Sequence, residues 1–302
     1  MFYILAIASG ILCAVMVAAN GGLATAFGSY SATVLIHVIG LTACSGIVLA
    51  RRVHLLPRQK IKLLLYMGGV IGVGTTLCNN LAFGAISLSA LLALSLLGQT
   101  CISLLIDQFG WFDMPRRPMR AAILPGFAFS AIGILCMVWP LHADSLYAVL
   151  LAVATGVCIV LSRTINASLS ENLSIWGSTW WNFATGLIFS LCLLLLIGRS
   201  EPLFSGLSTL PPWFCWTGGL LGVSLVALTS VAVKHLPAFP VTLCMFVGQL
   251  GTGLVLDAVI SGSFSLRSFI GCACVGAGIL LTQRAGKVHG VKTKIEKKPD
   301  PL

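Results

Sequence analysis

The chain has 302 residues, of which 58% are hydrophobic and 9% charged, and its mean hydropathy is +1.01. These values exclude an ordinary soluble domain, because the apolar runs approach the ~20 residues that cross a bilayer as a helix. Strand-like alternation of apolar and polar residues is absent, so helices must satisfy the backbone. The fold class we expect is an all-α integral membrane protein. The formal net charge of +10 requires no nucleic acid, since basic cytoplasmic loops give the same excess.

Ten apolar runs are predicted as transmembrane helices, and the first covers Phe2 to about Asn20. Residues 17–19 resemble a signal-peptidase site, but no basic residues precede this run and the segment recurs as residues 151–166, so we expect a retained helix. The other runs cover about residues 31–50, 62–83, 87–106, a stretch ending at 139, 146–161, 175–197, 214–233, 241–260 and 267–283.

The two halves of the chain are copies of each other. The clearest repeated segment returns after 150 residues, pairing Gly98, Gln99 and Asp107 with Gly248, Gln249 and Asp257. Further pairs, at nearly the same offset, are Asn20 with Asn166, Thr33 with Thr179, Gly40 with Gly186, Gly68 with Gly218, and Gly133 with Gly278. The sequence therefore indicates a tandem duplication of one five-helix unit.

The duplication divides the chain into residues 1–140, residues 146–284, and a basic cytoplasmic tail, residues 285–302, that is predicted to be disordered. Because each unit has an odd number of helices, the second is expected to be inverted in the membrane relative to the first. With both termini in the cytoplasm, sixteen Lys and Arg residues lie inside, Arg163 among them, and two lie outside, Arg199 and Arg267. This is a positive-inside distribution.

The repeated amides are candidate substrate-binding residues. Asp107 ends its helix on the cytoplasmic side and Asp257 nears the end of its helix on the outer side. Gln99 and Gln249, eight residues further in, therefore lie ~12 Å deeper from opposite faces, close to the midplane. An amide in hydrocarbon is disfavoured unless it faces protein, water or a ligand. Either both glutamines line a central site, or each bonds a neighbouring helix.

Asp107 and Asp257 are candidates for ion coupling or for gates at the two mouths, because a partly buried carboxylate can titrate near neutral pH. By the same geometry they lie too far apart to form a catalytic dyad. The alternative is that each is an interfacial carboxylate, paired with a neighbouring arginine or lying at a helix end in water.

Three further polar or aromatic residues fall inside predicted helices. Asn80 and His37 are candidate wall residues of the site, and His37 is either a proton carrier or a structural histidine without an acidic partner nearby in sequence. Trp181 is either part of an interfacial aromatic belt or a stacking wall for a substrate.

The chain lacks a Walker motif, HExxH, GxSxG and a His/Asp cluster, so we expect no catalytic residue, no cofactor and no enzyme. Its eleven cysteines lie mostly singly in apolar runs, as small packing residues do. Cys272 and Cys274 form the one close pair, with a spacing that fits neither structural zinc nor a thioredoxin-like motif, so no metal site is expected.

The repeat resembles the drug/metabolite transporter superfamily, and more narrowly a fused pair of the short five-helix YdcZ-type inner-membrane exporter proteins. The residues that carry the resemblance are the segment from Asn20 to Leu23, the duplicated segments Gly98 to Asp107 and Gly248 to Asp257, and the closing segments 133–135 and 278–280. The match covers the chain except its tail. It implies a multi-pass protein of the bacterial cytoplasmic (inner) membrane that moves a small metabolite or drug, with proton- or ion-linked export and no cofactor.

We therefore expect a secondary transporter that works by alternating access. Its expected partners are a small-molecule substrate and membrane lipid, without nucleic acid, and a homodimer is one assembly that the sequence allows. Two alternatives stay open: a membrane-embedded enzyme or scaffold acting on lipid, and a passive channel.

Overall fold

The computed structural model describes residues 2–57, 61–111, 121, 124–139, 143–199, 201, 210–235, 238–261 and 265–287. Its elements are the ten helices α1 Phe2–Phe27, α2 Ser29–Ala50, α3 Gly68–Ala82, α4 Leu88–Phe109, α5 Leu124–Val138, α6 Ala143–Asn172, α7 Ile175–Leu196, α8 Gly218–His235, α9 Ala238–Ser261 and α10 Leu266–Lys287. Two short 3-10 turns, Leu63–Met67 and Trp213–Thr217, lead directly into α3 and α8. The expected all-helical class and the ten helices are confirmed.

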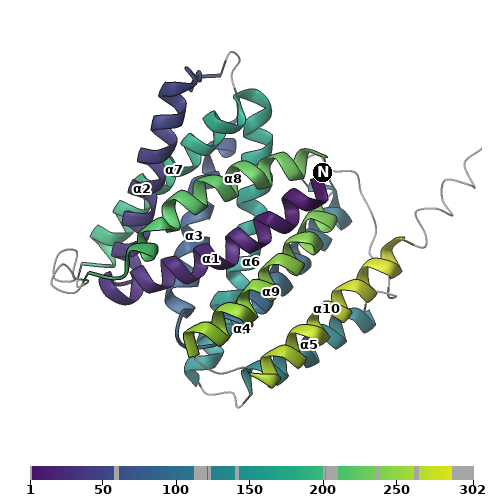
Figure 1. The fold of residues 1–302 in the computed structure, drawn as a ribbon. Helices are drawn as coiled ribbons and strands as arrows, with labels where there is room; N and C mark the ends of the chain where they lie inside the picture. Colours follow the sequence, from purple (N-terminus) through teal and green to yellow (C-terminus); the bar gives the residue numbers. More distant parts are fainter. Residues whose placement is uncertain are drawn as a thin grey trace, which may run out of the picture.

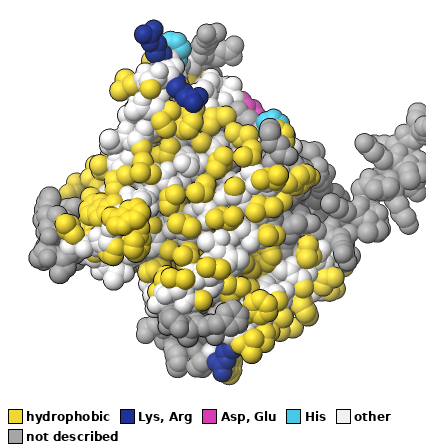
Figure 2. Space-filling view, in the orientation of Figure 1, with side chains coloured by type: hydrophobic (Ala, Val, Ile, Leu, Met, Phe, Trp, Pro, Cys, Tyr) yellow, Lys and Arg dark blue, Asp and Glu magenta, His cyan; other side chains and the backbone are white. Residues whose placement is uncertain are grey.

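Within the described residues, six helical stretches are long and apolar enough to cross a membrane on their own: Phe2–Phe27, Ser29–Ala50, Leu88–Ile106, Leu146–Asn172, Ile175–Leu196 and Trp213–Ala232. Figure 2 shows apolar side chains spread over one face of the bundle, with basic side chains at its ends. Large hydrophobic residues such as Ile4, Leu49 and Leu196 are at least 70% exposed. A surface of this kind suits lipid, because in a bilayer apolar side chains gain nothing by turning inward.

The sixth helix differs from the prediction. It was expected to end near Leu161, but α6 continues to Asn172, because no Gly or Pro lies between these residues and the hydroxyls of the polar stretch bond back to the helix. The Thr164 Oγ1, for example, donates to the Val160 carbonyl at 2.8 Å. Arg163 was placed in a cytoplasmic loop, and this was wrong, since it is a buried residue inside α6. Without Arg163, the number of Lys and Arg residues expected on the cytoplasmic side is one fewer than predicted.

Helices of the two halves are interleaved rather than separate. Among the described elements the main neighbours are α1 with α9, α4 with α6, α3 with α6, α2 with α7, and α5 with α10, each pair joining one helix from either half. Figure 1 shows α5 and α10 as a pair at one side of the bundle, next to α9 and α4. The other eight helices form the body that contains most of the buried polar residues described.

Glycines set how closely the interleaved helices approach. A Cβ at Gly10 of α1 would clash with the Met245 carbonyl of α9, and a Cβ at Gly156 of α6 would clash with the Ser95 carbonyl of α4. The two contacts are copies, because Gly10 and Gly156 are equivalent in the duplication and so are Ser95 and Met245. The packing of α1 on α9 is therefore repeated by α6 on α4, through small residues of the kind that bring membrane helices together.

Candidate functional site

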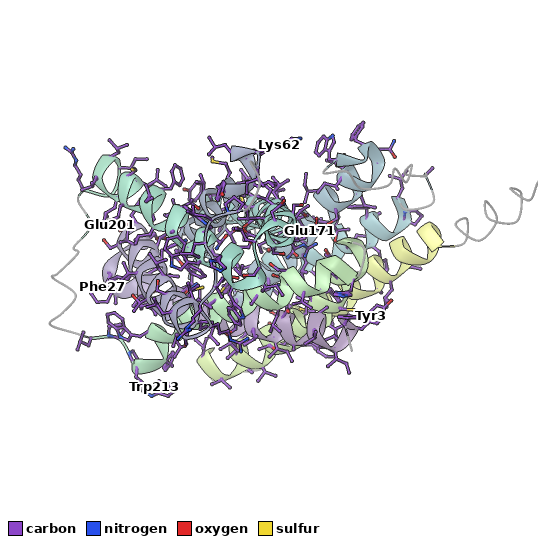
Figure 3. All side chains as sticks on the ribbon, turned by 90° about the horizontal axis from the view of Figure 1, so that it is seen from above. Tyr3, Phe27, Lys62, Glu171, Glu201 and Trp213 are labelled. Atoms are coloured by element: carbon purple, nitrogen blue, oxygen red, sulfur yellow. The ribbon has the colours of Figure 1, made fainter. Side chains whose placement is uncertain are left out.

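A cavity of about 110 Å³ lies between the two halves, lined by residues of α1, α2 and α3 from the first half and α6, α7, α8 and α9 from the second. Figure 3 shows side-chain oxygen and nitrogen atoms gathered in the interior of the bundle, whereas the labelled Tyr3 and Trp213 lie at its periphery. The polar lining comprises Asn20, His37, Thr75, Thr76, Asn79, Ser162, Arg163, Asn166, Asn182 and Thr229.

The lining follows the duplication. Of the twenty described lining residues, eighteen form nine pairs in which the partners are 146 or 150 residues apart. The pairs are Cys13 with Ile159, Met16 with Ser162, Asn20 with Asn166, Ile36 with Asn182, His37 with Phe183, Gly72 with Gly222, Thr75 with Leu225, Thr76 with Val226, and Asn79 with Thr229. Arg163 and Met245 are the two left over. Both halves thus contribute the same backbone positions, with different side chains at seven of the nine pairs.

Asn20 and Asn166 hold the same place in the two halves. A Cβ at Gly218, the first residue of α8, would overlap the Asn20 Oδ1, and a Cβ at Gly68, the first residue of α3, would overlap the Asn166 Oδ1. Each glycine therefore lets a helix start directly against an amide oxygen. The asparagines are interior residues of α1 and α6 and do not cap the ends of those helices.

On the second-half side the amides form a network. The Asn166 Nδ2 donates to the Asn182 Oδ1 at 2.7 Å and to the Ser162 Oγ at 3.3 Å, and the Ser162 Oγ donates to the Gly68 carbonyl at 2.8 Å. This chain of hydrogen bonds ties α6 to α7 and α3. It fixes the orientation of the second-half amides.

Buried oxygens without a hydrogen-bond partner among the described residues lie on lining residues of both halves, including the Asn166 Oδ1 of α6. The Oδ1 atoms of Asn20 and Asn79 and the Oγ1 of Thr75 are buried, and the described residues offer them no hydrogen-bond partner. All three residues line the cavity. Buried polar atoms normally have partners, so these oxygens are left unsatisfied by the described residues.

Arg163 projects from α6 and is 4% exposed. Its Nη1 donates to the Gln99 Oε1 at 3.4 Å and lies 3.6 Å from the Met245 Sδ, and its Nη2 donates to the Thr242 hydroxyl. Among the described lining residues it is the one that carries a charge. Sequence reasoning missed it as a site residue. The signal that could have found it is its place three residues before Asn166, on the same face of one continuous helix.

His37 lines the cavity and makes one clear hydrogen bond. Its Nδ1 lies 2.7 Å from the Thr33 carbonyl, which can only accept, so Nδ1 carries a hydrogen and donates. The Nε2 edge of the ring lies against Gly186. In the other half Phe183 lies against Gly40 in the same manner.

The two glutamines lie behind the lining. Gln99 and Gln249 are at most 1% exposed. Gln99 reaches the cavity through Arg163. Gln249 lies beside the lining thiol of Cys13, and its amide atoms find no hydrogen-bond partner of ordinary geometry among the described residues. Each amide is therefore one side chain removed from the cavity.

Asn80 and Trp181 also lie outside the described lining. The Asn80 Nδ2 donates to the Thr33 hydroxyl at 3.2 Å, which ties α3 to α2, while its neighbour Asn79 faces the cavity. The Trp181 Nε1 donates to the Leu55 carbonyl at 2.8 Å, and its ring meets Tyr66 edge to face. Trp181 thus braces the segment that follows α2.

Two carboxylates of the second half cap helices of the first half. The Asp257 carboxylate accepts from the backbone amides of Leu88 and Ser89, both at 2.9 Å, at the start of α4. At the start of α2, the Glu201 carboxylate accepts from the amides of Tyr30 and Ser31 at 2.8 and 2.9 Å. Figure 3 shows Glu201 at the same end of the bundle as Phe27, the last residue of α1. Asp107 belongs to α4, but its side chain lies outside the described residues.

The fold and the cavity define a class: a multi-pass helical membrane protein with a cavity of mixed polar and apolar lining between duplicated halves. The chain belongs to the family described as "Putative inner membrane exporter, YdcZ", whose sequence model matches residues 1–136 and again residues 147–281. The double match agrees with the fused pair expected from the sequence. The protein is therefore an inner-membrane protein of an exporter family.

Comparison with solved structures finds the fold again. One chain, described only as "Crystal structure of protein", aligns with a TM-score of 0.63 at 18% identity, over 94% of this chain and 98% of that one. At this identity the likeness concerns the fold alone. No curated protein matches the chain.

Proposed function

We propose that this protein is a secondary transporter that exports a small metabolite across the inner membrane by alternating access, with the cavity between its halves as the substrate site. It is not an enzyme in this proposal. The observation that carries the proposal is the pairing of eighteen lining residues into nine equivalent positions. A site built from equivalent positions of two halves can be exposed to either side by the same motion.

Inverted orientation of the halves is part of the proposal. It is supported by the odd number of helices in each half and by the repeated glycine contacts of Gly10 with Met245 and of Gly156 with Ser95. Topology follows from the basic residues, with both termini in the cytoplasm. In this arrangement the C-terminal ends of α1, α3, α7 and α9 lie at the outer side of the membrane.

Asp257 and Glu201 would then form an outer gate. Each carboxylate joins a second-half segment to the start of a first-half helix, where backbone amides and the helix dipole favour negative charge. Opening the cavity to the outside requires the two halves to separate on this side, so both contacts must break. Asp107, at the equivalent position of the first half, is the corresponding inner-gate or coupling candidate, and proton or ion coupling remains part of the proposal.

Gln99 and Gln249 act, in the same proposal, through the lining residues they touch. Gln99 orients Arg163, and Gln249 lies against Cys13. His37 forms part of the wall directly. Asn80 and Trp181 hold α3 and the segment after α2 in place around it.

Transport in proteoliposomes tests the proposal. The purified protein is reconstituted and offered a panel of labelled anionic, zwitterionic, neutral and cationic metabolites, with and without an imposed pH gradient. Asn79→Leu, which removes a polar atom from the cavity, should abolish accumulation. Asn172→Leu, at the exposed end of α6, is the matched control and should not. Equal activity of Asn79→Leu and wild type would remove the cavity from the mechanism.

Two other results would replace the proposed function. If no panel member moves although the protein is folded and inserted, an enzyme or scaffold acting on lipid becomes the better reading. Flux that never accumulates a solute under any gradient would indicate a passive channel.

A further inference from the structure

Building on the proposed function, we infer that Trp180 and Trp181 of α7 form the gate on the cytoplasmic side of the cavity. Both indole groups are hydrogen-bonded to the first half, and both bonds break when the cavity opens to the cytoplasm. The outer gate of Glu201 and Asp257 then has a counterpart of different chemistry at the other side of the membrane.

Helices α2 and α7 are equivalent in the two halves and lie side by side, as Figure 1 shows. They meet near their middles, where His37 lies against Gly186 and Phe183 lies against Gly40. At one end of the pair the carboxylate of Glu201, after α7, accepts from the amides at the start of α2. At the other end the segment after α2 meets the start of α7. The pair therefore joins the two halves on both sides of the membrane.

Two indole groups near the start of α7 donate hydrogen bonds to the first half. The Trp180 Nε1 donates to the Ser45 hydroxyl at 2.9 Å, and the Trp181 Nε1 donates to the Leu55 carbonyl at 2.8 Å. The two indole rings meet edge to face with centroids 5.2 Å apart. The Trp181 ring also meets the Tyr66 ring, at 4.9 Å. This cluster ties α7 to α2, to the segment after α2 and to the 3-10 turn before α3.

The acceptors of these hydrogen bonds distinguish a gate from an interfacial aromatic belt. Belt tryptophans lie at the level of the lipid headgroups, and that role requires no acceptor in the other half of the protein. Here both acceptors belong to the first half, and both rings are half-buried. The equivalent residues of α2 are Val34 and Leu35. The indole contacts therefore close one side of the α2–α7 pair, and a carboxylate closes the other.

The gate is joined to the cavity lining by the next residue of α7. Asn182 comes directly after Trp181 and lines the cavity, where its Oδ1 accepts from the Asn166 Nδ2 at 2.7 Å. A Cβ at Gly69 of α3 would overlap the main-chain carbonyl of Asn182, so α3 packs directly on this turn of α7. The start of α7 cannot leave the first half without carrying Asn182 with it. Separation of the halves on this side therefore opens the lining and breaks both indole bonds in one motion.

Labelling of Cys13 from each side of the membrane tests the gate. Cys13 lines the cavity and is 2% exposed, and its labelling needs no substrate. A membrane-impermeant maleimide is added to inside-out vesicles, which present the cytoplasmic side, and to right-side-out vesicles, and peptide mass spectrometry gives the rate. The test variants are Trp180→Phe, Ser45→Ala and Trp181→Phe, each of which deletes one hydrogen bond. Trp213→Phe, at an 80% exposed indole in the 3-10 turn before α8, is the matched control.

We expect each test variant to raise the cytoplasmic labelling rate of Cys13 by about three- to tenfold, the change that loss of one hydrogen bond makes to an opening equilibrium. Labelling from the outside should not rise, and Trp213→Phe should match the wild type from both sides. Trp180→Phe and Ser45→Ala remove the same bond, so their double variant should be labelled no faster than the faster single variant. If the Phe variants do not fold, Ser45→Ala, which removes a single hydroxyl, decides the result.

The outcomes separate the gate from the proposed function. A wild-type labelling rate from the cytoplasmic side in every folded test variant would overturn the gate. An equal rise from both sides would show a general loosening of the bundle, and a rise from the outside alone would move the tryptophans to the outer mouth; either result also overturns it. If the wild type moves no solute in the transport panel, the proposed function is wrong, whereas labelling still decides whether these tryptophans close the cavity.

Discussion

His37 of α2 and Phe183 of α7 occupy equivalent positions of the two halves, and their rings lie with centroids 5.8 Å apart at an interplanar angle of 55°. Each also covers the glycine one turn along the other's helix, His37 on Gly186 and Phe183 on Gly40. Equivalent residues of a duplicated protein meet in this way only where the two copies come together. The histidine is thus one member of a packing pair whose other member is a phenylalanine.

This pairing makes His37→Phe a specific test of its role. Because Phe183 shows that a phenyl ring fits against glycine at the equivalent position, His37→Phe should keep the melting temperature in detergent close to that of the wild type. It removes the titratable group and the donor to the Thr33 carbonyl. If the histidine is structural, the pH dependence of transport should be unchanged.

His37→Ala is the companion variant. It leaves a void against Gly186 and should lower stability by about 2 kcal/mol or more, in line with other large-to-small changes in packed interiors. A folded His37→Phe that transports but has lost its pH dependence would make His37 the proton carrier.

The close glycine contacts predict where a larger side chain would destabilise the packing of two helices. Gly156→Ala places a methyl group against the Ser95 carbonyl, and the cost of such overpacking is about 1–3 kcal/mol. The control is Gly46→Ala in α2, where nothing lies within 4 Å; there the gain in helix propensity should leave stability unchanged or raise it. Thermal unfolding in detergent measures both. Equal effects of the two substitutions would contradict the close packing of α6 on α4.

The sequence predicted the ten helices, the duplication and the family, because apolar length and repeated motifs are local properties of the chain. It also predicted His37 as a wall residue. It predicted Gln99 and Gln249 as interior residues, and both are buried. It could not tell which way each amide faces, since a rotation about the helix axis moves a residue from the cavity to a neighbouring helix. Asn79 and Asn80 are adjacent in the sequence, and of the two it is Asn79 that lines the cavity. The sequence does not show which of the two asparagines faces it.

Arg163 was misassigned for a different reason. A polar stretch containing Ser162, Arg163 and Thr164 reads as a loop when its neighbours are apolar, and the interior that satisfies these groups comes from distant segments. Gly68 accepts from Ser162, and Gln99 and Thr242 accept from Arg163. Tertiary partners of this kind cannot be read from local composition.

Gln99 and Arg163 should act as one unit in transport, since the Gln99 Oε1 accepts from the guanidinium. Gln99→Ala alone should slow transport by about three- to tenfold if orientation of the arginine matters, a loss of roughly 1 kcal/mol or slightly more. In the Arg163→Gln background it should add little, because contacting residues are not additive. Gln249 lies next to Cys13. Gln249→Ala should therefore have the same effect in the wild type and in the Arg163→Gln background. If the effects of Gln99→Ala and Arg163→Gln on transport are additive, the two residues do not act as one unit.

If Asp257 and Glu201 form an outer gate, removing either carboxylate should expose the cavity to the outside without changing the residues that line it. Asp257→Ala removes the carboxylate that holds the start of α4, and Glu201→Ala removes the one that holds the start of α2; loss of such a cap costs about 1 kcal/mol. Because both contacts join the two halves on one side, either substitution should favour opening there. A membrane-impermeant maleimide added outside should then label Cys13, a lining thiol that is 2% exposed, several-fold faster than in the wild type, as quantified by peptide mass spectrometry. Glu171→Gln, an exposed carboxylate at the opposite end of the bundle, should leave the labelling rate unchanged. Unaltered Cys13 labelling in both gate variants, with transport intact, would show that these carboxylates cap helices and do nothing to close the cavity.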